Sequence, residues 1–420
     1  IILLWEERPG GPMTTITLPN LLWYGNEPRQ IVFPDRWRVE VLGPPGFEKP
    51  ALDADGIERA FARPVGSPTI EELAKGAGEV AVVFDDITRP TPVSVVLPPV
   101  LRALRTAGVP DSHVRFIPAL GMHGAMHNID FRKKLGDEVV RRFPVYNHNP
   151  YENCEHLGSS PSGIPVYINR EFNSCDLKIG IGCITPHVHV GFGGGGKIVL
   201  PGIAGEKTIK AFHKEVIMRE PGSCGLGLTE GNVMAAEVTS VVRMSGLDLK
   251  LDALVNDRGQ ATDLFAGDPV AEYRLGVETA RDHYRTSLSP GKDIVVVNAY
   301  AKYNEMAICM LMGLSCINYE KATIVLVFDA PEGQVCHYLM RSFGREYGGE
   351  CYIKRGALPE TLEVLVCTSY PDRTMCDLFA PLESVTVVQE WAQALEYLER
   401  KHPGQASVGV IPDGTMQYFG

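Results

Sequence analysis

Short runs of β-branched and aliphatic residues alternate with stretches of helical apolar spacing along most of this 420-residue chain. The runs at 78–84, 177–182 and 322–328 are examples, and each has the length and composition of a buried strand. Alternation of this kind is typical of proteins in which helices cover mostly parallel strands. The sequence therefore predicts an α/β fold with mixed or mostly parallel sheets flanked by helices.

The same patterns predict two domains joined by a linker at 287–292. The first domain spans 13–286, and the second spans 293–405. Residues 406–420 are expected to return to the first domain. Strands are predicted at 78–84, 113–118, 164–169, 177–182, 293–298, 322–328, 362–368, 384–389 and 406–411, with a hairpin formed by 250–256 and 262–265. Helices are predicted at 93–107, 131–142, 205–218, 232–244, 268–286, 305–319, 335–343 and 390–401.

Composition restricts the partners. Fifty-one acidic and 40 basic residues give a formal charge of -11, which argues against nucleic acid or an anionic membrane as the main partner. The longest apolar uncharged stretch, 179–196, holds seven Gly and two His, so no membrane span is expected. Ten Cys without a C-x-x-C pair favour free thiols in a cytoplasmic protein. We expect Met13 to be the natural start, because the apolar run before it is too short for a signal peptide.

Histidine is distributed unevenly along the chain. Seven of the eleven histidines fall between His123 and His213. Most have Gly, Pro or Asn neighbours, which indicates loops, and loop residues held by a rigid scaffold often carry out catalysis. The cluster predicts a functional site, whereas a lone helical histidine such as His213 indicates little by itself.

The densest motif is TPHVHVGFGGGGK at 185–197. Its four consecutive glycines allow close approach of a phosphate or a planar cofactor; they are Gly193, Gly194, Gly195 and Gly196. Lys197 offers a cation for phosphate or a nucleophilic amine for a covalent bond. A P-loop is excluded because Ile198 stands where Ser or Thr is needed. A dinucleotide-binding fingerprint is disfavoured because no strand, turn and helix with a following acidic residue closely surround the motif.

Two further motifs follow predicted strands. DDITRPTP at 85–92 contains two carboxylates and Arg89, which can orient the hydroxyl and carboxylate groups of a small acid. His123 and His127 have the i, i+4 spacing of a zinc-protease helix, but Gly124 stands where that motif needs Glu. A zinc site is therefore disfavoured.

Together these motifs resemble the nickel-dependent lactate racemase family, whose members carry a nickel-pincer nucleotide. The resemblance rests on DDITRPTP, the strand followed by Gly-x-His, NHNP at 147–150 and PHVHVGFGGGGKIVLPGIAGEKTIKAFH at 186–213, in family order. His187 precedes Lys197 by ten residues and His213 follows it by sixteen, as in the family pattern. The resemblance is close over 23–213 and loose beyond.

The resemblance implies that the first domain binds a cofactor and carries the catalytic residues, that the second is the substrate-side domain, and that the active site lies in the cleft between them. Lys197 would hold nickel pyridinium-3-thioamide-5-thiocarboxylic acid mononucleotide through a thioamide, and His213 would be the protein's ligand to nickel, which imidazole suits. It also implies that three kinds of cofactor-making enzyme act as partners, namely a carboxylase, a sulfur transferase and a nickel insertase.

The resemblance further implies an isomerase, a racemase or epimerase of a small 2-hydroxy acid. His123 and His187 would be the two acid/base residues, and Asp86 and Arg89 would place the substrate or the catalytic hydrogen bonds. The C2 hydrogen of such an acid is difficult to remove as a proton. Hydride removal, with a histidine taking the hydroxyl proton, is the natural alternative, and two histidines suit the use of both enantiomers.

The second domain departs from the family pattern. The family's substrate-contacting Gln and Lys align with Ile308 and Leu311. Tyr300, Lys302 and Asn304 are replacement candidates for substrate binding, and we expect a 2-hydroxy acid other than lactate. Two alternatives stay open, an α/β oxidoreductase with a dissociable nicotinamide cofactor and a non-catalytic protein that binds a hydroxy acid or the cofactor.

Overall fold

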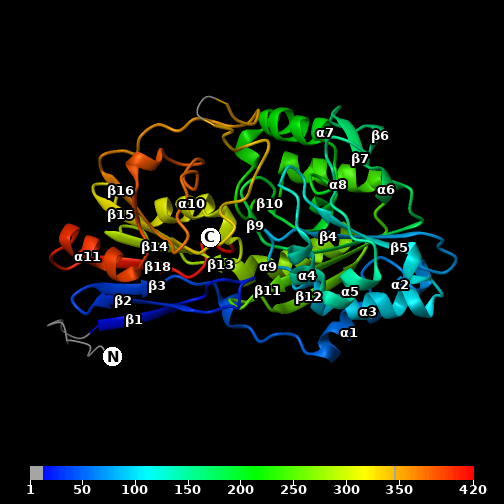
Figure 1. The fold of residues 1–420 in the computed structure, drawn as a ribbon, viewed down its shortest axis with the longest axis horizontal. Helices are drawn as coiled ribbons and strands as arrows, with labels where there is room; N and C mark the ends of the chain where they lie inside the picture. Colours follow the sequence, from blue (N-terminus) through cyan, green and yellow to red (C-terminus); the bar gives the residue numbers. More distant parts are fainter. Residues whose placement is uncertain (1–12, 345–346) are drawn as a thin grey trace.

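Two main sheets, one of five strands and one of six, form the framework of this computed structural model, which describes residues 13–344 and 347–420 (Figure 1). The predicted α/β class, with mixed and parallel sheets flanked by helices, is confirmed. The expectation that residues 1–12 precede the natural start concerns residues outside those that the structure describes. None of the helices in the described part is long and apolar enough to cross a membrane.

The five-stranded sheet has the order β12-β11-β8-β4-β5, and only β12 runs antiparallel to its neighbour. Its strands are β4 (Val80–Asp85), β5 (Val114–Ala119), β8 (Leu177–Cys183), β11 (Leu249–Val255) and β12 (Ala261–Gly267). All six residues of β4 are buried, because helices cover both faces of this sheet.

The helices on the two faces of the five-stranded sheet pack in separate hydrophobic clusters. One face is covered by α2 (Ile70–Leu73), α3 (Val93–Thr106), α4 (Asn128–Leu135) and α5 (Asp137–Arg142). The other is covered by α6 (Arg170–Asn173), α7 (Glu206–Ala211) and α8 (Val233–Ser245). Around this sheet lie α1 (Ala54–Ala62), α9 (Ala271–Tyr284), the hairpin of β6 (Cys154–Ser159) and β7 (Pro165–Asn169), and the short pair β9 (Pro186–His187) and β10 (Gly191–Phe192).

The six-stranded sheet is parallel throughout, with the order β17-β16-β15-β14-β18-β3. Its strands are β3 (Arg38–Val41), β14 (Ile294–Ala299), β15 (Ala322–Phe328), β16 (Leu362–Cys367), β17 (Thr386–Val388) and β18 (Ser407–Ile411). Helix α10 (Ala307–Cys316) packs on one face, and α11 (Trp391–Lys401) packs on the other with the hairpin of β1 (Met13–Leu18) and β2 (Arg29–Pro34).

Both ends of the chain meet at the six-stranded sheet, which local patterns did not predict. The blue N-terminal strands lie beside the orange-to-red C-terminal ones (Figure 1), and β3 pairs with β18. Residues 406–411, expected to return to the first domain, form β18 between β14 and β3 in this sheet. After it, the two-residue strand β19 (Tyr418–Phe419) pairs with β13 (Arg285–Thr286), directly after α9. The proposed domain limits stay a prediction.

Most predicted elements form within a few residues of the expected bounds, but three predicted helices differ. The helix expected at 131–142 is two helices, α4 and α5, because Gly136 between them has a φ of 85°. The helix expected at 205–218 continues beyond α7 as a π-helical turn over Phe212–Val216. The helix expected at 335–343 does not form, because tertiary hydrogen bonds occupy its backbone: Val335 N–H donates to Asn304 and Tyr338 N–H to Met122.

All ten cysteines lie in the described part of the chain and are unpaired, as the sequence indicated. They are distributed over both sheets and their loops, and no pair forms a disulfide. The fold therefore depends on its hydrophobic clusters and hydrogen bonds.

A buried ion pair holds the loop after β4. Lys134 of α4 has no exposed side-chain surface, and its Nζ donates to Oδ1 of Asp85 at 2.7 Å. The same Nζ donates to the carbonyl oxygens of Arg89 and Thr91, at 2.9 and 3.2 Å. The lysine therefore fixes the whole loop to the helix beneath it.

Replacing Lys134 by Met should lower the free energy of unfolding by about 3–5 kcal/mol, because Asp85 would keep a buried charge without its partner. Urea denaturation measures this change. Lys75→Met is the matched control, because Lys75 is exposed; its effect should stay within about 0.5 kcal/mol. Equal unfolding midpoints for the two variants would contradict the assigned role of Lys134.

Candidate active site

A cavity of about 680 Å³ lies where the loops after β4, β5 and β8 face the segment after β14 and helix α10. Carboxyl ends of parallel strands are where open α/β sheets usually bind ligands. The polar residues that line it include Asp86, Arg89, His123, His187, His189, Lys197, His213, Lys302, Asn304, Glu305 and His337. The predicted residues from the Asp-rich loop, the Gly-x-His turn and the Gly-rich motif therefore meet at one place.

His123 and Asp86 form a hydrogen-bonded pair at the ends of neighbouring strands. Nδ1 of His123 lies 2.6 Å from Oδ2 of Asp86, and the backbone N–H of Thr88 donates to Oδ1 of Asp86 at 3.0 Å. Burial opposes ionisation of Asp86, but the pKa of its carboxyl is lowered to about 2 by His123, Arg89 and the bond that the Thr88 hydroxyl donates. The ionised carboxylate accepts from Nδ1–H, so Nε2 of His123 carries the lone pair.

Arg89 connects the loop after β4 with the segment that follows β14 of the six-stranded sheet. Its Nη1 donates to Oε2 of Glu305 at 2.8 Å and to Oγ1 of Thr88 at 2.8 Å. Glu305 ends the short turn Tyr303–Glu305 between β14 and α10. Burial opposes the charge of Arg89, but Glu305 and Asp86 raise the pKa of its guanidinium, so it is a fixed cation.

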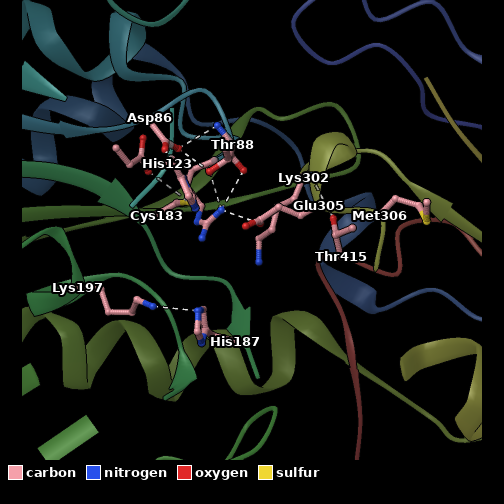
Figure 2. A network of polar contacts seen from close by, with 12 residues as sticks. Asp86, Thr88, His123, Cys183, His187, Lys197, Lys302, Glu305, Met306 and Thr415 are labelled. Carbon is pink, nitrogen blue, oxygen red and sulfur yellow. Dashed lines mark hydrogen bonds and ion pairs between the residues drawn. The ribbon is translucent and has the colours of Figure 1, made fainter. Parts of the chain in front are cut away.

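His187 and Lys197 form the second pair, apart from the first in Figure 2. Nδ1 of His187 accepts from the backbone N–H of His189 at 3.1 Å, with Val190 N–H at 3.5 Å. An accepting ring nitrogen bears no proton, so the proton of the neutral ring is on Nε2. Nε2 lies 2.9 Å from Nζ of Lys197 and donates to it, which requires a lone pair on the amine.

Charge and burial favour the same neutral form of Lys197. The pKa of its amine is lowered to about 7, mainly by burial and also by the nearby cations Arg89 and Lys302, while Glu305 opposes this shift. Burial, with Lys197 as the next cause, also lowers the pKa of His187 well below its usual value. This lysine is therefore a nucleophilic amine near neutral pH.

His213 lies on the π-helical turn that follows α7, a local irregularity that is frequent at functional sites. Its Nδ1 donates to the carbonyl oxygen of Ile209 at 2.9 Å, so Nε2 has the lone pair that a metal would need. Burial lowers the pKa of His213 to about 3 despite that bond. Among the described residues, no group of three or more His, Cys, Asp or Glu could hold a metal; the resemblance requires only this one ligand.

The four glycines divide into two pairs. Gly193 and Gly194 line the cavity, whereas Gly195 and Gly196 do not. A Cβ on Gly195 would lie 2.6 Å from the Tyr273 ring, and one on Gly196 would lie 2.9 Å from Val238. These two glycines therefore allow close packing, and their expected role in cofactor binding stays a prediction.

Of the three candidate substrate-binding residues, two line the cavity and one does not. Tyr300 does not line the cavity, because its hydroxyl donates to Asn26 at 2.8 Å within another hydrophobic cluster. Lys302 lines it, and burial, with Arg89 as the next cause, lowers the pKa of its amine to about 8. Asn304 lines it as well, and its buried Oδ1 has no hydrogen-bond partner in the structure. Ile308 and Leu311 also line the cavity.

His337 is the residue that sequence reasoning missed. Its ring lies edge to face with His123, with centroids 5.2 Å apart, and burial lowers its pKa to about 2. It lies in the segment predicted as a helix, outside the histidine-rich stretch, so no local signal pointed to it. His189 is a second cavity residue without a predicted role; its ring lies between those of His187 and His213.

Comparison with known proteins finds similarity to lactate racemases. Residues 24–224 match the lactate racemase N-terminal domain family. Lactate racemase from Lactiplantibacillus plantarum is 28% identical over 289 residues, which cover 67% of this chain and 67% of that protein. Lactate racemase from Thermoanaerobacterium thermosaccharolyticum is 28% identical over 248 residues, which cover 59% of this chain and 58% of the relative.

Solved structures share the fold. The lactate racemase apoprotein from Thermoanaerobacterium thermosaccharolyticum superposes with a TM-score of 0.71 at 21% identity, over 97% of this chain and all 100% of that chain. A protein from Thermotoga maritima superposes with a TM-score of 0.63 at 17% identity, over 85% of this chain and 100% of its own. The two-sheet framework is therefore shared by both proteins.

The depressed pKa of Lys197 predicts unusual reactivity. Acylation by acetic anhydride should rise as the pH increases through about 7, because only the deprotonated amine attacks. Competitive labelling across pH 5.5–9, read by peptide mass spectrometry on protein with a free Lys197 amine, measures the midpoint. The exposed Lys207 in the same digests corrects for reagent loss. A midpoint near the ordinary lysine value of about 10.4 would contradict the assignment.

Proposed function

The chain belongs to the lactate racemase family, and on that basis we propose that it is a racemase or epimerase that inverts the C2 centre of a 2-hydroxy acid. It uses a nickel-pincer nucleotide attached to Lys197. One observation supports the proposal most: the pairs His123–Asp86 and His187–Lys197 line a single cavity together with His213.

The residues fit this cofactor. Nζ of Lys197 has the lone pair that a thioamide bond to a thiocarboxylic group requires, and Nε2 of His213 has the lone pair that nickel requires. Both side chains line the same cavity. When bound, the nickel-pincer nucleotide supplies an electrophilic carbon that takes the C2 hydrogen as hydride and returns it.

His123 takes the proton from the substrate hydroxyl. Its Nε2 lone pair is fixed by the bond from Nδ1–H to Asp86, at 2.6 Å. The ionised Asp86 stabilises the imidazolium that forms when the proton arrives. A pair of this kind accelerates a proton transfer by about 10²–10⁴-fold.

His187 is the second acid/base residue. In this structure its Nε2 bears the proton, so it is prepared to give a proton where His123 is prepared to take one. Two such groups suit an inversion at C2, because the hydroxyl groups of the two enantiomers can face different histidines.

Arg89 and Lys302 bring positive charge for the substrate carboxylate. Glu305 balances part of that charge and fixes the guanidinium through its bond to Nη1. Asn304 presents an unpaired Oδ1 that can accept from a hydroxyl group. These groups orient an anionic hydroxy acid relative to His123.

The cofactor implies other proteins. A carboxylase, a sulfur transferase and a nickel insertase must make it, and we propose that the chain receives it from them in the cytoplasm. The unpaired thiols agree with a reducing compartment. The substrate is a small molecule, and neither nucleic acid nor a membrane is part of the proposal.

Co-expression with the cofactor-making enzymes should add the mass of the cofactor to the intact chain and about one nickel per chain. Lys197→Ala should abolish the mass increase, because it removes the amine to which the cofactor would be attached. The exposed Lys207 gives the control Lys207→Ala, which should load normally. Turnover by unmodified, nickel-free protein would refute the proposal, and saturable quenching of NADH fluorescence would favour the nicotinamide alternative.

Asp86→Asn should reduce kcat by about 10²–10⁴-fold while the loaded mass is retained, because Asn cannot stabilise the imidazolium of His123. The value of kcat/KM should fall by the same factor in both directions, since a substitution in the enzyme cannot change the equilibrium constant of the reaction. Chiral chromatography of timed samples measures both rates. Asp55→Asn, an exposed position, is the control. Unchanged turnover would exclude the pair from catalysis, and loaded protein that turns over no acid at all would support the non-catalytic alternative.

A further inference from the structure

One wall of the cavity is apolar, unlike the end that is lined by histidine and lysine side chains. We call it the apolar wall; its residues are Ile308, Leu311, Leu314, Leu358, Leu378 and Phe379. The first three belong to α10, and the others come from the segments on either side of β16. Three of the six also pack on the hydrophobic cluster between α10 and the six-stranded sheet, so the wall is continuous with the core.

Helix α10 presents this wall as a regular stripe. Ile308, Leu311 and Leu314 recur at every third position and share one face of the helix. Cys309 and Met312 are buried on the sheet side. Leu311 is 48% exposed, although it lines the cavity. An apolar ligand group seated here would remove this leucine from water, which favours binding.

We propose that the substituent at C2 of the substrate is a bulky apolar group, branched aliphatic or aromatic, that lies on the apolar wall. The proposal rests on the proposed racemase function and names its substrate class. Asn304, with its unpaired Oδ1, precedes Ile308 by four residues, so the polar and apolar parts adjoin. An acid whose carboxylate lies toward Arg89 and Lys302 would therefore direct its side chain to the wall.

Two arginines also line this part of the cavity, and both donate to backbone carbonyl oxygens. Arg341 donates to the carbonyl oxygens of Thr374 and Val335, at 2.5 and 3.5 Å. Nε of Arg355 donates to the carbonyl oxygen of Leu378 at 2.9 Å. Their backbone bonds make them part of the wall's support.

The test is a panel of single enantiomers on cofactor-loaded protein: lactate, 2-hydroxy-4-methylpentanoate, phenyllactate, malate and 2-hydroxyglutarate. Each buried methylene favours binding about fourfold. The three additional carbons of 2-hydroxy-4-methylpentanoate should therefore raise kcat/KM roughly 60-fold above that for lactate. Higher kcat/KM for lactate or for either dicarboxylate would overturn the inference.

Leu311→Glu tests the wall itself. A carboxylate on this stripe should lower the kcat/KM ratio of 2-hydroxy-4-methylpentanoate to lactate at least 10-fold. The position is half exposed, so we expect the variant to fold, and its unfolding midpoint checks this. Leu275→Glu is the matched control, because Leu275 is 41% exposed on α9 and does not line the cavity. An unchanged ratio in Leu311→Glu would overturn the inference.

The two proposals fail in different ways. Racemisation of lactate or malate in preference to the apolar acids would overturn the substrate class and leave the racemase function intact. Loaded protein that inverts none of the five acids would count against both. Calorimetric titration with 2-hydroxy-4-methylpentanoate then separates the cases, because tight binding without turnover supports the apolar wall and contradicts the racemase function.

Discussion

Burial of both sheets on both faces is the constraint on which the rest of the structure depends. All residues of β4 and β15 and all but one residue of β8 are buried. These strands therefore have almost no place for polar side chains along their length. Polar groups are instead displaced to the strand ends. Because the strands are parallel, those ends lie at one edge, and Asp86, His123 and His187 meet there without belonging to neighbouring sequence. The site is therefore a consequence of the way the sheet is covered.

The middle of β11 is the exception, and it supports the site. Lys250 and Asp252 are fully buried in this strand and form an ion pair, with Nζ 2.5 Å from Oδ1. Burial raises the pKa of Asp252, and Lys250 opposes that rise. The other oxygen of Asp252 accepts from the backbone N–H of Gly195. A buried carboxylate thus holds the Gly-rich segment two residues before Lys197, and this N–H is already used within the protein instead of facing a phosphate.

Local sequence patterns were sufficient to predict the elements that are determined by neighbouring residues. The strands β4, β5 and β8 were predicted from their apolar runs, and the ordered motifs indicated that His123, His187, Lys197 and His213 belong together. Pairing of β3 with β18 was not predictable, because it joins the two ends of the chain. The place of His337 depends on backbone bonds to a distant turn, which no periodicity encodes. The position of Tyr300 outside the cavity was not predictable for the same reason, since its hydrogen-bond partner Asn26 lies in a distant loop.

The electrostatics of the cavity link the charge state of Lys197 to the neighbouring cations Arg89 and Lys302. Lys302 is buried there, and Arg89 and Lys197 are partly buried; repulsion between these cations is one cause of the depressed pKa values of the two lysines. Glu305 offsets only part of this charge. The neutral amine of Lys197 is thus the form that the other two cations favour. An acyl bond at Nζ would make that neutrality permanent, because an amide-type nitrogen does not take up a proton near neutral pH. The remaining positive charge on Arg89 and Lys302 would then be available to an anionic substrate, at a site where burial strengthens every ionic contact.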